Sequence, residues 1–348
     1  MLEDLRIPIV QAPLAGGPST PELTAAVVQA GAFGFLAAGY KTADALGDDI
    51  AVTRALTAAP FGVNVFAPGT AADPATYADY VDGLRDEARR HGVELGEPCF
   101  EEDAWEGKLA LLEADPVAVV SFTFGCPPPE VIVRMQAAGS EVWVTVTDPD
   151  EAQAAAAAGA DALIVQGVEA GGHRGSFVDT DGAGDYGLIA LLQLIAARTD
   201  LPLIASGGIA SGSAVAAVLC AGAWAAQIGT AFMRCPEAAT AAVHRDALAT
   251  PAPTRLTRAF SGRNARGIVN RFLREHSADA PIAYPEVHHA TAPLRAAGRK
   301  AGDADVINLW AGQAHALARE LPAAELVATL AAEAAERLQA VSGRFAGA

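Results

Sequence analysis

The chain has 348 residues, 51% of them hydrophobic, which suffices for one large α/β domain or two ordinary ones. Its formal charge of −17, from 24 Lys and Arg against 41 Asp and Glu, argues against a nucleic-acid-binding surface and against a polybasic membrane contact. Its four cysteines form no C-x-x-C pair, so a zinc site is not expected and no metal site is predicted.

The first residues do not resemble a targeting segment. Glu3 and Asp4 stand where a secretory signal peptide would be basic, and no apolar region follows them. The chain contains no run of eighteen apolar residues, which argues against a membrane span. We therefore expect a soluble cytoplasmic protein that acts on small molecules. The sequence leaves the oligomeric state open, a homodimer being one option.

Short apolar runs alternate with helical patterns over the first 230 residues. The runs predict strands at 7–13, 33–38, 61–66, 117–123, 141–146, 161–165, 201–206 and 224–229. The patterns between them predict helices at 23–29, 44–58, 75–90, 108–114, 130–138, 149–158, 188–198 and 213–219. This alternation is typical of a parallel sheet covered by helices.

A recurring Ala-Gly pair supports the count of elements. The pairs at Gly31, Gly139, Gly159 and Gly222 each follow a predicted helix and precede a predicted strand. Glycine at such a place adopts the left-handed conformation that ends a helix. Eight strands are what a (β/α)8 TIM barrel needs. The competing fold is an open doubly wound sheet, which would carry its ligand-binding glycines after the first strand.

The remainder of the chain departs from this alternation. Residues 233–302 are rich in Pro, Arg and His and have no clear strand, so we interpret them as a helical insertion that caps the barrel mouth. Two amphipathic helices, 306–320 and 323–340, are predicted to return to the barrel. The predicted organisation is a barrel core at 1–232, a capping insertion at 233–302 and C-terminal helices at 303–348.

The stretch from 160 to 175 combines a buried strand with a glycine-rich loop. Gln166 stands where the strand should end, and Gly171, Gly172 and Gly175 surround His173. Loops of this kind at strand ends are where α/β proteins place binding and catalysis. We predict that His173 is a catalytic base beside a flavin. The alternative is a glycine-rich turn with a solvated histidine.

Two further loops are candidates for phosphate binding. Gly207 and Gly208 follow the seventh predicted strand, and Gln227, Ile228, Gly229 and Thr230 follow or end the eighth. Barrels often bind phosphate at this pair of loops through backbone N–H groups. The alternative is two ordinary turns. No G-x-G-x-x-G motif follows the first predicted strand, where a Rossmann dinucleotide site would have it, and no G-x-S-x-G motif is present.

Several polar and aromatic residues near the C-terminus have less certain roles. His288 and His289 have no carboxylate or cysteine in metal spacing and are interpreted as solvated or structural. Trp310 is predicted to lie in the core, with a place facing the pocket as the alternative. Tyr284 is the second candidate for a base.

The chain resembles the nitronate monooxygenase family, also called 2-nitropropane dioxygenases, which are FMN enzymes on a TIM barrel. The matching stretches are 9–17, 61–64, 165–175, 205–209, 227–230 and 309–313. Flavin enoyl-ACP reductases share a version of the glycine-histidine stretch. The resemblance implies FMN contacts at Asn64, Gln166, Gly171, Gly208 and Gln227 to Thr230, with His173 as the base. Leu14 and Ile228 stand where the family usually has Met, and both keep apolar bulk.

The reaction that this resemblance implies is the oxidation of alkyl nitronates by O2 to a carbonyl compound and nitrite, with propionate 3-nitronate as an example. His173 would stabilise the anion when protonated or remove an α-proton when neutral. Two alternatives stay open. One is an NAD(P)H-dependent FMN reductase of quinones or enoyl thioesters, and the other is a barrel that binds a phosphorylated metabolite without redox chemistry.

Overall fold

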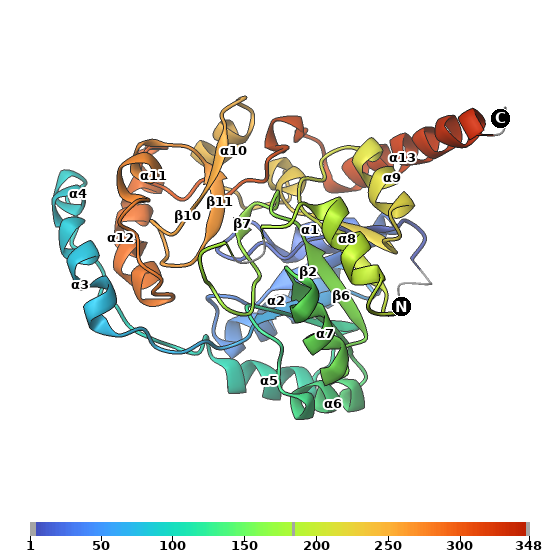
Figure 1. Cartoon of the computed structure of the whole chain (residues 1–348), viewed down its shortest axis with the longest axis horizontal. Coiled ribbons are helices and arrows are strands. Elements are labelled where there is room, and N and C mark those ends of the chain that lie inside the picture. Colours follow the sequence, from blue (N-terminus) through green and yellow to red (C-terminus); the bar gives the residue numbers. More distant parts are fainter. Residues whose placement is uncertain (1–4, 183–184, 346–348) are drawn as a thin grey trace.

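Eight parallel strands form a closed barrel, as the sequence predicts (Figure 1). The structure is a computed structural model that describes residues 5–182 and 185–345, so Glu3 and Asp4 lie outside the described part. The barrel strands, in order, are β1 (Ile9–Gln11), β2 (Phe33–Ala37), β3 (Gly62–Phe66), β4 (Val119–Thr123), β5 (Glu141–Val146), β6 (Ala162–Gln166), β8 (Leu203–Ser206) and β9 (Ala225–Ile228). Because β9 pairs with β1, the sheet has no free edge, and the open doubly wound alternative is wrong.

Helices follow the strands around the outside of the barrel. They are α1 (Pro21–Gln29), α2 (Ala43–Leu56), α5 (Trp105–Ala114), α6 (Pro129–Ala138), α7 (Pro149–Ala158), α8 (Leu188–Ala196) and α9 (Gly212–Cys220). The last helix, α13 (Ala323–Phe345), packs against α9 and α1. Within the described residues, no helix combines the length and the apolar character that a membrane span requires.

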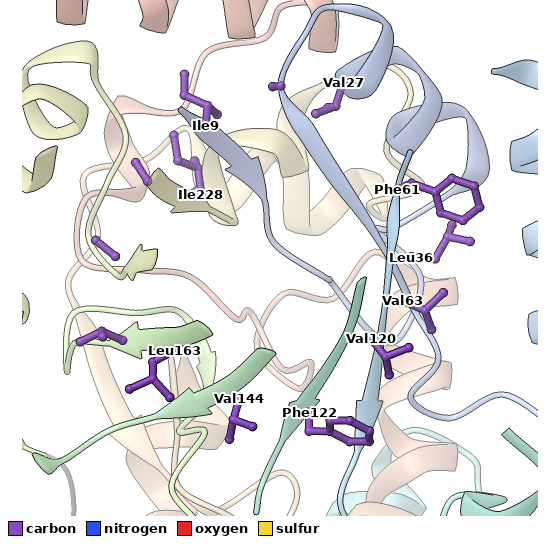
Figure 2. Packing of buried hydrophobic residues seen from close by; sticks show 14 of the residues in the cluster. Ile9, Val27, Leu36, Phe61, Val63, Val120, Phe122, Val144, Leu163 and Ile228 are labelled. Atoms are coloured by element: carbon purple, nitrogen blue, oxygen red, sulfur yellow. The ribbon is translucent and has the colours of Figure 1, made fainter. Parts of the chain in front are cut away.

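Alternating side chains of the strands form two hydrophobic layers. Val63, Val120 and Val144 point outward and belong, with helix residues such as Val27, to the larger layer (Figure 2). Inside the barrel, Phe33 and Trp143 belong to a smaller cluster of fully buried residues, with their ring centroids 5.6 Å apart. Successive strand residues face opposite sides of a sheet, so the same short runs supply both layers.

The predicted helix-to-strand joints are confirmed. Gly31, Gly139, Gly159 and Gly222 have φ angles of 93°, 105°, 98° and 99°. These values lie in the left-handed region, which residues with a Cβ rarely adopt. Each glycine therefore ends its helix and turns the chain directly into the next strand.

The capping segment contains strands that the sequence analysis did not predict. β10 (Thr254–Thr257) and β11 (Ala265–Ile268) pair antiparallel, and β11 also pairs with β7 (Gly172–His173), which lies in the glycine-histidine loop. The capping helices α10 (Ala242–Leu248), α11 (Arg271–His276) and α12 (Glu286–Ala301) lie beside this sheet (Figure 1). The strands have only two to four residues, too few to establish an alternating pattern, and they form because their partners are nearby.

Two predicted helices differ from the structure. The helix expected at 306–320 is wrong, because only the short 3-10 helix η3 (His315–Leu317) forms there. Val306, Ile307 and Leu309 are buried in a separate hydrophobic cluster, so their apolar spacing reflects burial of an extended chain. The helix expected at 75–90 is divided at Leu84 into α3 (Pro74–Gly83) and α4 (Arg85–Arg90). A further 3-10 helix, η2 (Thr230–Arg234), directly follows the last barrel strand.

Candidate active site

A cavity of about 430 Å³ lies at the carboxyl ends of the barrel strands. Barrel enzymes bind ligands at this face because the loops after the strands converge there. The predicted site residues that line the cavity are Asn64, Gln166, Gly171, His173, Gly207, Gly208, Gln227, Gly229 and Thr230. Leu14 also lines it. Ile228 does not, because its side chain is buried in the layer between the barrel and the helices.

The capping segment fixes His173. In the pairing of β7 with β11, His173 lies opposite Ala265. Its Nε2 atom is 2.8 Å from the hydroxyl oxygen of Ser261. Its ring packs edge-to-face against Phe124 and Trp310, with centroid distances of 5.7 and 5.4 Å. A side chain with these constraints is held in one orientation at the cavity wall, as a catalytic group requires.

The surroundings of His173 favour its neutral form. Burial lowers the pKa of His173 to about 3, and the positive charges of Arg263 and Arg295 act in the same direction. A histidine in water has a pKa near 6.5, so this imidazole is neutral at neutral pH and is able to accept a proton. Of the two roles considered from the sequence, a base for a neutral substrate fits this state better than a permanent cation.

Tyr284, the second candidate for a base, is less suitable. Its hydroxyl donates a hydrogen bond to the hydroxyl of Tyr40 at 3.0 Å. Burial raises the pKa of Tyr284 well above its usual value of 10. A phenol in this state donates hydrogen bonds but is not deprotonated near neutral pH. His173 is therefore the better candidate for a base.

Gln166 supports the loop that carries His173. Its Nε2 atom donates to the backbone carbonyl of His173 at 3.2 Å. Its Oε1 atom accepts from Arg174 at 2.8 Å and from the backbone N–H of Gly175 at 2.9 Å. Gln166 thus holds the loop in place in addition to lining the cavity, a second function that its position at the strand end did not reveal.

The two phosphate-type loops present free backbone donors. Gly207 and Gly208 have φ angles of 122° and 67°, which glycine adopts without strain. Within the described part of the chain, the N–H groups of Gly208 and Gly229 donate to no other group. N–H groups at neighbouring strand ends suit the oxygens of a phosphate. These loops therefore fit a phosphorylated ligand.

Packing also explains two of the predicted glycines. A Cβ on Gly171 would lie 2.3 Å from the backbone nitrogen of Gly312, which belongs to the segment after the capping helices. A Cβ on Gly208 would lie 3.0 Å from Cβ of Glu169. The backbone of Gly312 is in turn fixed, because its N–H donates to the Thr230 hydroxyl at 3.0 Å. Gly171 therefore allows the segment around Gly312 to approach the glycine-histidine loop closely, and Gly208 allows Glu169 to approach the loop after β8.

Gln227 has an unsatisfied polar atom at the cavity. The side chain is buried, and its Oε1 atom has no hydrogen-bond partner in the described chain. An unpaired buried acceptor costs about 1–3 kcal/mol. An N–H group of a bound heterocycle would remove that cost. Asn64, by contrast, already donates to Ser121 and Thr123 at 3.0 Å each.

The charged side chains that line the cavity are positive. None of the chain's carboxylates is among the described residues that line it, although the sequence has 41 Asp and Glu. The charged or titratable side chains found there are those of Arg295, Arg299, Tyr40 and four histidines. In a protein with a net charge of −17, this distribution attracts an anionic ligand to the cavity and away from the rest of the surface.

Arg295 is the group that the sequence analysis missed. It is 5% exposed, and no described carboxylate pairs with it. Its Nε atom donates to Thr291 at 3.1 Å, and one terminal nitrogen donates to the carbonyl of His288 at 2.8 Å. Its other terminal nitrogen makes no hydrogen bond in the described chain. A buried cation without a countercharge is costly unless a ligand supplies one.

His288 is not a solvated side chain, and the structural role that the sequence also allowed describes it better. Its ring stacks on Tyr40 with centroids 4.3 Å apart and planes 3° apart, and it lines the cavity. Tyr40 and Phe124 follow barrel strands with φ angles of 66° and 77°. Such values are strained for residues with a Cβ and are most frequent at functional sites. Trp310 also lines the cavity, as the alternative interpretation proposed.

A second group of polar residues lies outside the cavity. Glu87, Glu275 and His276 are close enough to share a cation. Arg271 already pairs with both carboxylates, and it donates to Glu275 at 2.7 Å. We interpret this group as an ion-pair network between α4 and α11.

A closed (β/α)8 barrel with a cavity at the carboxyl ends of its strands is the architecture of the TIM-barrel class of enzymes. The family model described as nitronate monooxygenase matches residues 1–333, and the chain belongs to that family. It is therefore an oxidoreductase of a family of flavoenzymes that oxidise nitronates.

Relatives and solved structures agree with this assignment. The chain is 44% identical to nitronate monooxygenase of Pseudomonas aeruginosa, over 94% of this chain and 95% of the relative. It is 42% identical to that of Paraburkholderia phytofirmans, over 95% and 93%. Its structure is similar to a nitroalkane oxidase from Streptomyces ansochromogenes, with a TM-score of 0.95, 54% identity and coverage of 98% and 99%. It is also similar to FabK from Thermotoga maritima, with a TM-score of 0.76, 26% identity and coverage of 99% and 98%.

Proposed function

We propose that the enzyme uses FMN to oxidise alkyl nitronates with O2, forming a carbonyl compound and nitrite, and that propionate 3-nitronate is among its substrates. The observation that carries this proposal is the charge of the cavity wall, which has no described carboxylate and contains the buried cation Arg295. A nitronate is an anion, and propionate 3-nitronate has a carboxylate as well. The wall would therefore attract this substrate and repel cationic molecules.

The residues at the barrel end would hold FMN. Backbone N–H groups of Gly208 and Gly229 are available to its phosphate. The unpaired Oε1 atom of Gln227 is an acceptor for an N–H of its ring system. When bound, the flavin supplies the electron-transfer chemistry, and the protein supplies binding and orientation. A mononucleotide is favoured over FAD because no G-x-G-x-x-G fingerprint follows the first strand, where a dinucleotide-binding fold carries it.

His173 would act on substrates that enter as neutral nitroalkanes. Its imidazole is neutral because burial lowers its pKa to about 3. It would remove the α-proton and leave the electron pair on the carbon and nitro group of the product nitronate. A substrate supplied as a nitronate needs no such step, so His173 would affect it only through binding.

Arg295 would bind an anionic group of the substrate at the outer part of the cavity. His288 contacts both Arg295 and Tyr40, and Tyr284 lies between His288 and His173 with ring centroids 6.2 and 5.5 Å away. Arg295 is thus separated from the base by a short chain of side chains. A nitronate group near His173 and a carboxylate near Arg295 would occupy the two ends of this wall.

Anaerobic reduction of the bound flavin tests the proposal. The purified enzyme should be yellow, and mass analysis of the heat-released pigment should give FMN. Propionate 3-nitronate should bleach the flavin quickly under anaerobic conditions, and NADH should not. Rapid bleaching by NADH alone would indicate the reductase alternative, and a colourless protein that fails to take up FMN would indicate the non-redox alternative.

A further inference from the structure

Ser261 is a buried hydroxyl that contacts the proposed base. It is 1% exposed and lies in the turn between β10 and β11 of the capping segment. The turn itself is fixed, because the N–H of Ser261 donates to the carbonyl of Arg258 at 3.1 Å. The next residue, Gly262, has a φ of 76° and packs so closely on Ala283 that an added Cβ would lie 2.1 Å from that carbonyl oxygen. The hydroxyl therefore has a defined position.

The hydrogen bonds of Ser261 determine the direction of its contact with His173. Its Oγ atom donates to the carbonyl of Arg263 at 3.3 Å. A serine hydroxyl has one proton, and a carbonyl oxygen only accepts. With that proton engaged, Oγ is an acceptor for Nε2 of His173, which is 2.8 Å away. The proton of the neutral imidazole is then on Nε2.

The other ring nitrogen of His173 is left free to react. Among the described residues, Nδ1 makes no hydrogen bond. It is also not among the fully buried polar atoms that lack a partner. A neutral imidazole with its proton on Nε2 has its lone pair on Nδ1. The hydrogen bond that one ring nitrogen makes thus decides which nitrogen is available as a base.

We propose that Ser261 is a positioning residue that holds His173 as the Nε2–H tautomer, so that Nδ1 accepts the α-proton of a neutral nitroalkane. In this step the Cα–H bond breaks, an N–H bond forms at Nδ1, and the electron pair is delocalised into the nitro group. Ser261 also accepts from the resulting imidazolium, whose positive charge strengthens that hydrogen bond. The inference depends on the proposed function of His173 as the base.

The substitution Ser261→Ala tests this inference in the FMN-loaded enzyme. Without the hydroxyl, the imidazole populates both tautomers and turns more freely. We expect kcat with neutral nitroethane to fall about three- to tenfold, as the loss of one hydrogen bond to a reacting group predicts. Ethylnitronate turnover should change less than twofold. Nitrogen-15 spectra should show the His173 signal of one tautomer in the natural enzyme and an averaged signal in the variant.

Two further variants make the result specific. Ser261→Thr keeps the hydroxyl and should restore most of the nitroethane activity. Ser277→Ala removes a hydroxyl of the capping segment that contacts Thr257 at 2.6 Å and does not line the cavity, so it should leave both activities unchanged. The His173 signal is assigned by its loss in His173→Asn.

Two results would overturn the inference. Equal losses of nitroethane and nitronate activity in Ser261→Ala would mean a general structural role. An unchanged tautomer signal would mean that Ser261 does not direct the proton. If His173→Asn itself has no selective effect on nitroethane, the proposed function of His173 fails instead, and the two failures are thereby distinguished.

Discussion

The barrel end and the capping segment contribute different chemistry to the same cavity. The barrel end offers backbone N–H groups and side-chain amides, such as Gly208, Gly229 and Gln227. The capping segment offers a buried cation, Arg295, and the hydroxyl of Ser261. We infer that the barrel end is built for a cofactor, while the capping segment selects the substrate and orients the base. Changes in the two regions should therefore have separable effects.

The largest effect is expected from His173→Asn, which removes the base where the two regions meet. Activity on neutral nitroethane should fall about 10²–10⁴-fold, the usual contribution of a general base. Activity on ethylnitronate should fall far less, and flavin content should stay near normal, because other residues are assigned to the cofactor. Steady-state kinetics on both substrate forms measure the difference. Small and equal losses would place the base elsewhere.

Arg295→Met should weaken substrate binding without releasing the flavin. A hydrogen bond to a charged group contributes about 1.5–3 kcal/mol, so KM for propionate 3-nitronate should rise about ten- to a hundredfold. The rise for ethylnitronate should be smaller because it has no carboxylate. Arg255→Met removes an exposed charge of the same segment and is the matched control. Loss of FMN in the Arg295 variant would mean that this cation binds the cofactor.

Gly171→Ala should disrupt the contact between the glycine-histidine loop at the barrel end and the segment that follows the capping helices. The new Cβ would collide with the backbone of Gly312, which cannot move easily because Thr230 holds it. Overpacking of this kind costs about 1–3 kcal/mol, and Tm should fall by about 2–10 °C. Gly69→Ala is the control, since an added Cβ there meets no atom within 4 Å. An unchanged Tm in Gly171→Ala would contradict the close approach.

The smallest effect is expected from pH. Because burial lowers the pKa of His173 to about 3, the imidazole stays in its neutral, proton-accepting form at every pH well above that value. The kcat/KM for freshly dissolved nitroethane should therefore stay nearly constant from about pH 7 down to about pH 5. A decrease centred near pH 6.5 would indicate that His173 titrates as it does in water.

Local sequence patterns were sufficient to predict the barrel and much of its rim. Short apolar runs such as 161–165 form strands wherever their neighbours cover both faces, and glycines such as Gly159 end helices through their own backbone freedom. Eight of these units, repeated in order, specify a closed barrel. The places of His173 and of the two glycine loops at the cavity could be predicted because these loops follow such strands.

Only the tertiary structure could place the capping side of the cavity. β10 and β11 are short strands without an alternating pattern, and they form because β7 is available for pairing. The apolar residues at 306–309 suggested a helix by their spacing. In the structure they are buried in an extended segment instead. Ser261 contacts His173 although the two residues are 88 positions apart in the sequence. Arg295 stands out as a site residue only because no described carboxylate lies beside it, which the sequence does not show. Contacts between distant segments depend on how the chain packs, which local periodicity does not encode.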